Sequence, residues 1–250
     1  MFKKIVFIAL IALFMGCDVE PQDTEVQGYY VPDCPYVEYF EIRPVNGGVK
    51  IIVYTGANRD INIPSTIDGQ PVVAIGNGAF AMRMLTYYQS RRLTRVVIPD
   101  SVTYIGNWAF RDNRLTSVTI PNSVTYIGQF AFAVNPRFDL IITGTGEITS
   151  ASVPNAPMGS VTIEYGITAI GNSAFRYQSL HGSVTIPDSV TYIGDWAFYN
   201  NNLNRSRFGN SVRTINEKAF WRNNLTSVSI PYHTEVDPQA FDPHVVITRW

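Results

Sequence analysis

The residues best suited to acid–base or metal chemistry gather near the end of the chain. They are His233, Glu235, Asp237, Asp242 and His244. Imidazole and carboxylate groups together can hold a transition metal. Their spacings of two, two, five and two residues match no known ligand motif, and polar residues at an exposed end also serve solubility. We therefore predict neither a metal site nor a cofactor.

Catalytic motifs are also missing from the rest of the sequence. It has no Gly-x-Ser-x-Gly, no His-Glu-x-x-His and no phosphate-binding loop. The 19 basic residues are balanced by 20 acidic ones, which argues against an electrostatic nucleic-acid binder. A hydrophobic content of 46% excludes a disordered chain. We predict a folded protein that is not an enzyme and does not bind nucleic acid.

Aromatic side chains recur at two fixed positions, one just before an Ile and one just before an Ala-Phe pair. They are Tyr104, Tyr126 and Tyr192 at the first position, and Trp108, Phe130 and Trp196 at the second. Rings at equivalent positions could stack on one another and stabilise the fold. They could instead form a binding surface, for which Tyr and Trp are favoured anchors. The sequence leaves both interpretations open.

A basic segment over residues 82–95 interrupts the regular spacing described below. It carries Arg83, Arg91, Arg92 and Arg95, with no acidic residue between Asp68 and Asp100. Insertions into a repetitive fold often carry function, and a local positive patch would attract polyanions such as sulfated glycans. The alternative is a solvated loop whose arginines pair with neighbouring carboxylates.

The first sixteen residues have the pattern of a secretory signal peptide. Lys3 and Lys4 precede an apolar run over residues 5–15, which is too short to span a bilayer comfortably. The alternative is a short buried helix. The sequence Phe-Met-Gly-Cys at 14–17 resembles the lipobox of bacterial lipoproteins, although that family prefers Leu and a small residue where Phe14 and Met15 stand.

The lipobox resemblance implies that Cys17 is lipidated and anchors the protein to a membrane without spanning it. The protein would then be exported and held at the bacterial cell envelope, either on the cell surface or on the periplasmic face. Residues 17–27 are acidic and contain little to bury. We expect them to form a flexible tether.

Most of the chain is an internal repeat marked by Ala-Phe pairs. Their rings are Phe80, Phe110, Phe132, Phe175, Phe198, Phe220 and Phe241, and a spacing of 21 to 23 residues separates most of them. The gap of 43 residues after Phe132 is nearly two units long, so we place a degenerate unit at about 136–160. Seven clear units and this one extend over residues 58–250. A repeated unit predicts a stack with one continuous core.

The best-preserved unit, LTSVTIPNSVTYIGQFAFAVN at 115–135, shows how one turn folds. Val118 and Ile120 alternate about a polar residue, as a half-buried strand requires. Pro121 ends the strand because it has no N–H. Ala131 permits close approach, and Phe132 fills the interior.

This unit closely resembles the BspA-like, or Treponema pallidum type, leucine-rich repeat, whose pattern is LxxIxIPxxVxxIGxxAFxxC. That family's Cys is replaced here by Asn113, Asn135, Asn201 and Asn223, and by Gln178 in one unit. We expect these amides to hydrogen-bond successive loops or to be exposed turn residues. The resemblance implies a β-rich solenoid of about 7–8 units, with parallel short strands and short helical or 3-10 turns.

Residues 28–57 precede the repeats and contain two alternating runs around Asn46-Gly47-Gly48. This pattern predicts a β-hairpin that caps the open end of the solenoid.

The family resemblance implies a surface antigen or adhesin that binds a protein or glycan ligand, for example in host matrix. The alternative is a periplasmic or envelope scaffold that meets only the cell's own components. The sequence does not predict an oligomeric state.

Overall fold

The computed structural model describes residues 40–56, 58–81, 92–156 and 158–250. The predicted signal peptide, Cys17, the tether and the first part of the cap lie outside the described residues, as do Arg83 and Arg91.

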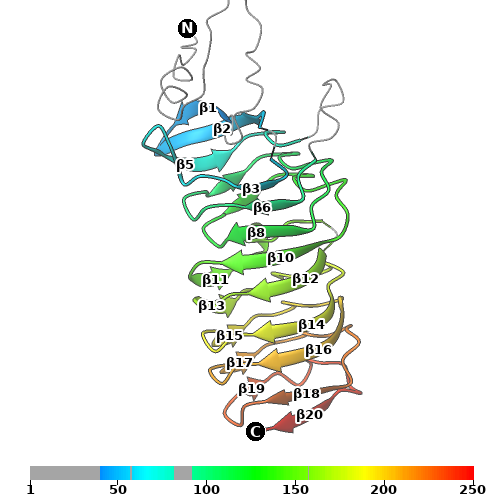
Figure 1. Cartoon of the computed structure of the whole chain (residues 1–250). Helices are drawn as coiled ribbons and strands as arrows, with labels where there is room; N and C mark the ends of the chain where they lie inside the picture. The colour runs from blue at the N-terminus through cyan, green and yellow to red at the C-terminus, as the bar shows by residue number, and fades with distance from the viewer. Residues whose placement is uncertain (1–39, 57, 82–91, 157) are drawn as a thin grey trace, which may run out of the picture. The chain divides into compact units, whose positions relative to one another are not determined.

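From Phe40 onward the described residues form one compact unit that winds into a stack of coils (Figure 1). One side of the stack consists of longer strands that run parallel to one another from coil to coil. These are β3 (Asp60–Asn62), β6 (Arg95–Val97), β8 (Ser117–Pro121), β10 (Phe138–Thr143), β12 (Met158–Ile163), β14 (His181–Ile186), β16 (Asn202–Phe208), β18 (Ser227–Ile230) and β20 (Val246–Arg249).

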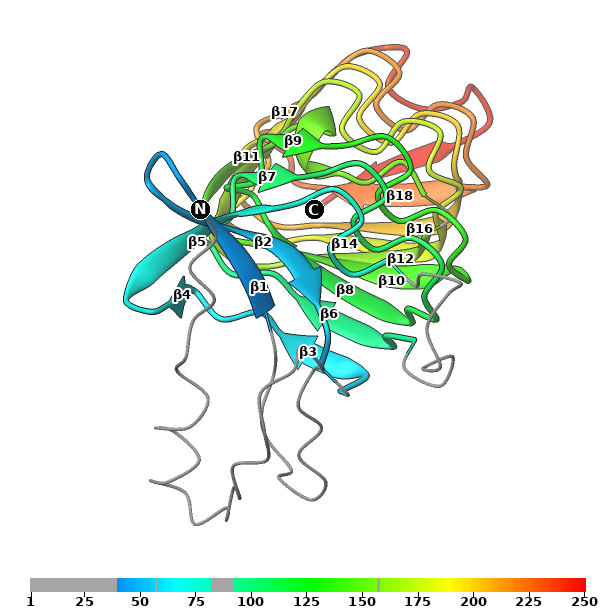
Figure 2. The same ribbon diagram turned by 90° about the horizontal axis from the view of Figure 1, so that it is seen from above.

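A second side consists of short strands, also parallel, which pair as β5-β7-β9 and β11-β13-β15-β17-β19. Seen along the stack, the two sets of strands lie on different sides of each coil (Figure 2). Their bounds are β5 (Gln70–Ile75), β7 (Tyr104–Ile105), β9 (Tyr126–Ile127), β11 (Gly146–Ile148), β13 (Ile167–Ile170), β15 (Tyr192–Ile193), β17 (Thr214–Ile215) and β19 (Glu235–Val236). The short β4 (Thr66–Ile67) pairs antiparallel with β5.

The hairpin predicted around Asn46 is present at the first end of the stack. Strands β1 (Phe40–Val45) and β2 (Gly48–Tyr54) pair antiparallel, and β2 continues the short-strand sheet by pairing parallel with β5. Glycine is required at both turn positions. Gly47 has φ +83°, and a Cβ at Gly48 would collide with the carbonyl oxygen of Pro71.

The predicted β-rich solenoid of parallel strands is confirmed, with two differences. The stack has about nine turns rather than 7–8, because β20 adds a strand after the last Ala-Phe pair. The turns expected to be helical are mostly not: within the described residues the one helix is the 3-10 helix η1 (Ser150–Ser152).

Left-handed residues at the Ala-Phe corner explain why helices do not form there. Trp108 has φ +56° and Asp112 has φ +59°, and a helix cannot continue through such residues. These left-handed residues turn the backbone N–H groups of the corner towards the neighbouring coil. Those of Trp108, Phe110 and Asp112 all donate to carbonyl oxygens of the next coil, at 3.0, 2.7 and 3.0 Å. The corner therefore forms backbone hydrogen bonds between coils instead of the hydrogen bonds within a coil that a helix would form.

Replacing Val134 with Asn is expected to raise the free energy of unfolding by about 1 kcal/mol. Val134 is β-branched and 60% exposed, yet it has φ +58°, a conformation that costs most L-residues roughly 1–2 kcal/mol. Asn tolerates that conformation, and Asn200 holds the equivalent place in a later coil with φ +54°. Urea denaturation followed by circular dichroism measures the change. A loss of stability would contradict the strain argument.

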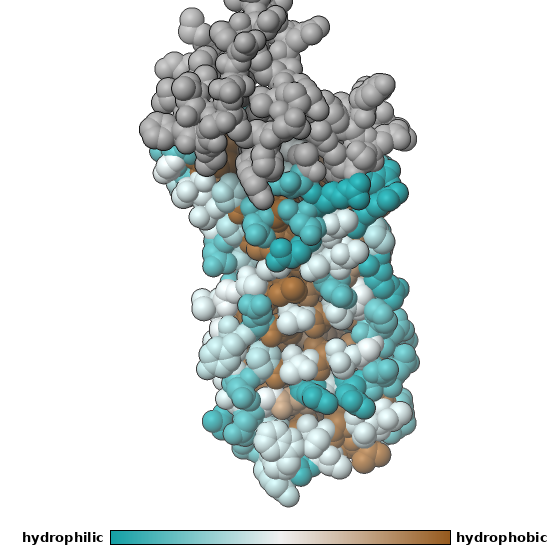
Figure 3. Space-filling view, viewed as in Figure 1, coloured by the Kyte–Doolittle hydropathy of each residue, from teal (hydrophilic) through white to brown (hydrophobic). Residues whose placement is uncertain are grey.

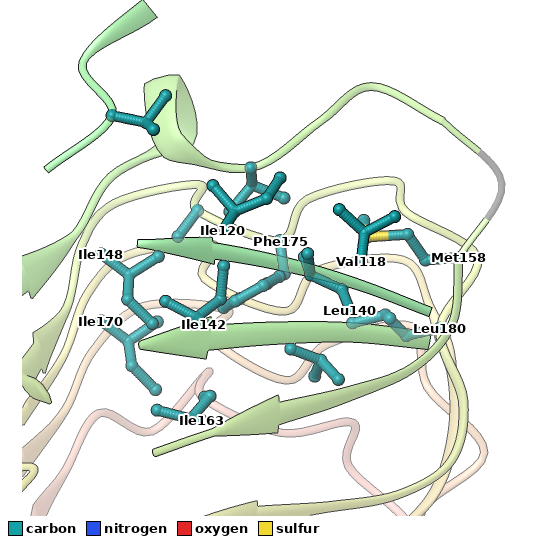
Figure 4. Close-up of a cluster of buried hydrophobic side chains, with 14 of the residues drawn as sticks. Val118, Ile120, Leu140, Ile142, Ile148, Met158, Ile163, Ile170, Phe175 and Leu180 are labelled. Atoms are coloured by element: carbon teal, nitrogen blue, oxygen red, sulfur yellow. The ribbon is translucent and has the colours of Figure 1, made fainter. Parts of the chain in front are cut away.

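The interior is filled by the repeated Phe rings and by the inward residues of both strand sets. Figure 4 shows Phe175 among inward aliphatic side chains of both sets. The rings of Phe80, Phe110 and Phe132 stack at centroid distances of 4.9 and 5.0 Å. A second stack joins Phe175, Phe198, Phe220 and Phe241 at 5.0, 5.0 and 5.2 Å. All seven rings are at most 4% exposed. Neighbouring coils therefore share one continuous core.

The asparagines that replace the family's Cys form an asparagine ladder inside the loops. The amide of Asn113 donates to the carbonyl oxygens of Phe80 and Phe110, at 2.9 and 3.0 Å, and accepts from the backbone N–H of Leu93 at 2.9 Å. Asn135, Asn201 and Asn223 repeat this arrangement. Each amide thus joins two coils, whereas Oε1 of Gln178 is buried without a hydrogen-bond partner in the described structure.

The degenerate coil, formed by β10 and β11, interrupts several of these arrays. Its Ala-Phe position falls at Ser152-Val153, and Val153 contributes a smaller buried side chain. The short-strand sheet divides between β9 and β11, and the Phe stack divides between Phe132 and Phe175. The long strands continue through this coil because β10 pairs with both β8 and β12. Their sheet divides further on, between β12 and β14 and again between β16 and β18.

Candidate functional site

The tyrosines that precede the short-strand Ile lie on the outside of the stack. Tyr104 and Tyr126 stack with their ring centroids 4.9 Å apart and their planes 9° apart. Tyr126 is 44% exposed. Tyr192 does not join this pair, because its neighbours in register are Ala169 and Thr214. The predicted stripe is therefore one stacked pair and one separate ring.

Trp108 and Phe130 form an aromatic corner on two adjacent coils. They are 42% and 61% exposed, and both have φ +56°. Gly78 holds the equivalent place in the first coil with φ +62°. The backbone conformation is needed for bonding between coils, but the large apolar side chains are not. Gly or Asn would suit the conformation better.

Trp196 lies in a cluster of rings and cations rather than on an open surface. The guanidinium of Arg176 is 4.6 Å from the ring centroid of Trp196 and 5.4 Å from that of Tyr199. Nζ of Lys218 is 4.9 Å from the Trp196 ring on another side of the cluster. Such cation–π contacts contribute about 0.5–2 kcal/mol each. Here they link three coils, so Trp196 has a clear structural role.

The basic patch is partly neutralised in the described residues. Arg92 forms an ion pair with Asp112 at 3.2 Å, and Nη1 of Arg95 donates to Oδ1 of Asn62 at 3.4 Å. Arg114 lies one coil further along. Its backbone N–H donates to the carbonyl oxygen of Leu93 at 2.9 Å. This edge, where the long strands begin, is strongly hydrophilic at the right of Figure 3.

Three of the five polar residues near the chain end, Asp237, Asp242 and His244, have side-chain contacts with the backbone. Nε2 of His244 lies 3.1 Å from the carbonyl oxygen of Leu225. Oδ2 of Asp242 accepts from the backbone N–H of Arg222 at 2.8 Å. No group of three or more His, Cys, Asp or Glu side chains within the described residues could hold a metal ion.

In the described part of the chain, no helix combines the length and apolar character needed to cross a membrane.

Sequence reasoning missed Arg176, Lys218 and Lys50. Each belongs to a set only when the coils are placed in register, because its ring partners are one or two repeats away. An alignment of the units would place Lys218 beneath Trp196, since both precede an Ala-Phe pair. No comparable signal exists for Lys50, which lies in the hairpin.

A family model described as the BspA type leucine rich repeat region matches residues 81–152 and 146–247, with 6 copies. No curated protein is significantly similar to the chain in sequence.

Three solved structures are similar to this chain at low identity. A leucine rich cell surface protein from Faecalibacterium prausnitzii is 22% identical, with coverage of 88% of this chain and 78% of that chain and a TM-score of 0.34. The T. pallidum leucine rich repeat protein is 22% identical, with coverage of 84% and 83% and a TM-score of 0.40. A leucine-rich repeat protein from Bacteroides ovatus is 20% identical, with coverage of 86% and 67% and a TM-score of 0.34.

Proposed function

The chain belongs to the BspA-type leucine-rich repeat family, and on this premise we propose that it is an exported, lipid-anchored protein that binds a macromolecular ligand at the cell envelope. The repeat surface recognises a protein or glycan non-covalently, and the protein carries out no catalysis. The signal-peptide pattern of residues 1–16 and the lipobox-like sequence that ends at Cys17 support the location.

The observation that carries this proposal is the aromatic corner. Two large rings, Trp108 and Phe130, are exposed to solvent in a left-handed backbone conformation. Exposure of apolar rings and occupation of that conformation both cost stability. Neither cost is needed for the fold, since Gly78 meets the same backbone requirement with no side chain. Exposed rings on a rigid scaffold suit a binding surface.

Replacing both Trp108 and Phe130 with Ser is expected to weaken ligand binding at least about tenfold while leaving thermal stability unchanged or higher. Binding is measured on a panel of immobilised extracellular-matrix proteins and on a glycan array. Tyr165→Ser is the matched control, because Tyr165 is 80% exposed on a different turn. If the double variant and the control bind equally, the aromatic corner is not the binding surface.

Replacing Cys17 with Ala is expected to abolish partitioning of the protein into the detergent phase, because the acyl chains of the anchor would be lost. Phase separation of cell extracts, followed by immunoblotting, measures this. Continued partitioning of the variant would refute the lipid anchor. Protease treatment of intact cells then separates an outward-facing adhesin, which is digested, from an envelope scaffold, which is protected.

A further inference from the structure

One column of outward side chains on the short-strand sheet contains a gap. In register, the column runs from Lys50 on β2 through Ala74 on β5 to Tyr104 on β7 and Tyr126 on β9. Adjacent strands are about 4.8 Å apart, so two long side chains, those of Lys50 and Tyr104, flank the methyl group of Ala74, which is 7% exposed. Between Lys50 and Tyr104 the column therefore lacks one side chain.

This gap opens as a groove of about 340 Å³ beside the hairpin. Ala74 lies in it, with Lys50 and Tyr104 on either side and Asn46 and Thr103 also along its walls. The volume is at the lower end of the range for small-ligand sites. The groove is open to solvent and has room for one sugar ring of a longer glycan.

The groove offers an aromatic face for stacking. One face of Tyr104 is covered by Tyr126, at 4.9 Å between parallel rings. Nζ of Lys50 lies 5.9 Å from the centroid of the Tyr104 ring. A sugar ring that entered the groove would pack its C–H face on the free face of Tyr104, and the ammonium group of Lys50 would move aside to lie next to it.

Two cations lie side by side at the hairpin edge of the groove, Lys50 in its wall and Arg43 next to Lys50. Lys50 is directly opposite Arg43 across the antiparallel hairpin, so both side chains lie on the same face. Like charges placed directly opposite each other destabilise a strand pair. Within the described part of the chain, neither cation forms an ion pair. A bound anion would relieve their repulsion.

We propose that this groove binds a sugar ring that carries a carboxylate, as in a uronic acid residue of an acidic glycan. The ring stacks on Tyr104, the carboxylate accepts a hydrogen bond from Lys50, to which the adjacent Arg43 adds positive charge, and Asn46 and Thr103 contact the hydroxyl groups. This inference rests on the proposed function, because both take the repeat surface to be a binding surface. It adds a site and a ligand class.

The chain contains its own matched control for this site. Ala169 occupies the same column in a later coil, between Glu147 and Tyr192. A small residue again lies beside a tyrosine, but a carboxylate stands where Lys50 stands in the first gap. An acidic sugar would be repelled there.

The test is isothermal titration of the purified protein with a trimer of galacturonic acid and with maltotriose, its neutral counterpart. We expect the acidic trimer to bind, more weakly as ionic strength rises, and maltotriose to bind at least about tenfold more weakly, a difference that corresponds to about 1.4 kcal/mol. Ala74→Tyr fills the gap with the residue that the next two coils carry. It is expected to abolish binding, whereas Ala169→Tyr leaves it unchanged.

Lys50→Gln and Arg43→Gln provide a second route, because both residues are on the surface and their loss does not require repacking. Each is expected to weaken binding of the acidic trimer about tenfold. Unchanged binding by folded Ala74→Tyr, equal binding of maltotriose, or no binding of the trimer to the native protein would overturn the inference. These outcomes would leave the proposed function standing, since that function is tested at Trp108 and Phe130 with other ligands.

Discussion

Replacing Asn201 with Ala is expected to lower the free energy of unfolding by about 3 kcal/mol. Asn201 is 5% exposed. Its Nδ2 donates to the carbonyl oxygens of Phe175 and Phe198, at 2.8 and 2.9 Å, and its Oδ1 accepts from the N–H of Leu180 at 3.0 Å. Removal of the amide leaves three buried backbone groups without partners. Each such group costs roughly 1–3 kcal/mol, partly offset where water enters.

Urea denaturation followed by circular dichroism measures this loss. Asn202→Ala is the matched control, because Asn202 is the next residue and is exposed on β16. It is expected to change stability by less than about 0.5 kcal/mol. If Asn201→Ala were as mild as Asn202→Ala, the asparagine ladder would not stabilise the loops, and the asparagines would be ordinary turn residues.

Replacing Phe132 with Ala is expected to cost about 3–5 kcal/mol. The ring is 1% exposed, stacks on Phe110 at 5.0 Å and contacts the tilted ring of Phe138 at 5.8 Å. Truncation leaves a cavity between two coils, which the paired backbones above and below cannot close. The free energy of unfolding in urea measures the cost.

Phe130 provides the control for this prediction, because it is the same residue type two positions earlier in the same coil. It is 61% exposed, so Phe130→Ala is expected to change stability by less than about 0.5 kcal/mol. A cost below about 1 kcal/mol for Phe132→Ala would mean that the Ala-Phe pair does not form the core, contrary to the burial described above.

The fold could be predicted from the sequence because one short pattern repeats several times. Each copy of Ile-Pro marks the end of a long strand, and each Ala-Phe pair marks a buried corner. The hairpin could also be predicted, because Asn46 and the two glycines after it have few other uses between alternating strands.

The conformation of the corners could not be predicted in the same way. Bulky and β-branched residues rarely adopt a left-handed φ, and three of them do so here, Trp108, Phe130 and Val134. Residue preference alone would therefore predict a different backbone conformation at these corners. This conformation is imposed by backbone hydrogen bonds to the neighbouring coils. The sequence of a single unit does not show those bonds. The predicted number of units is too low for a simpler reason, since the units are counted by their Ala-Phe pairs and β20 is followed by no such pair.

The candidate sites were only partly visible in the sequence. The aromatic positions could be identified from their spacing, but their different surroundings could not. Trp196 is packed against Arg176 and Lys218, whereas Trp108 is open to solvent. The groove at Ala74 depends on which residues lie above and below a methyl group. That information exists only once the hairpin is placed in register with the first two coils.

The degenerate coil has a mechanical consequence. In a linear array, each coil is held by its two neighbours alone, so the whole is as strong as its weakest junction. In and next to the degenerate coil the aromatic stacking is interrupted, the short-strand sheet divides between β9 and β11, and the long-strand sheet divides between β12 and β14. The contact between neighbouring coils is thus weakest in this region. Tension or partial denaturation would part the array into an amino-terminal block, which holds the groove and the aromatic corner, and a carboxy-terminal block of comparable length.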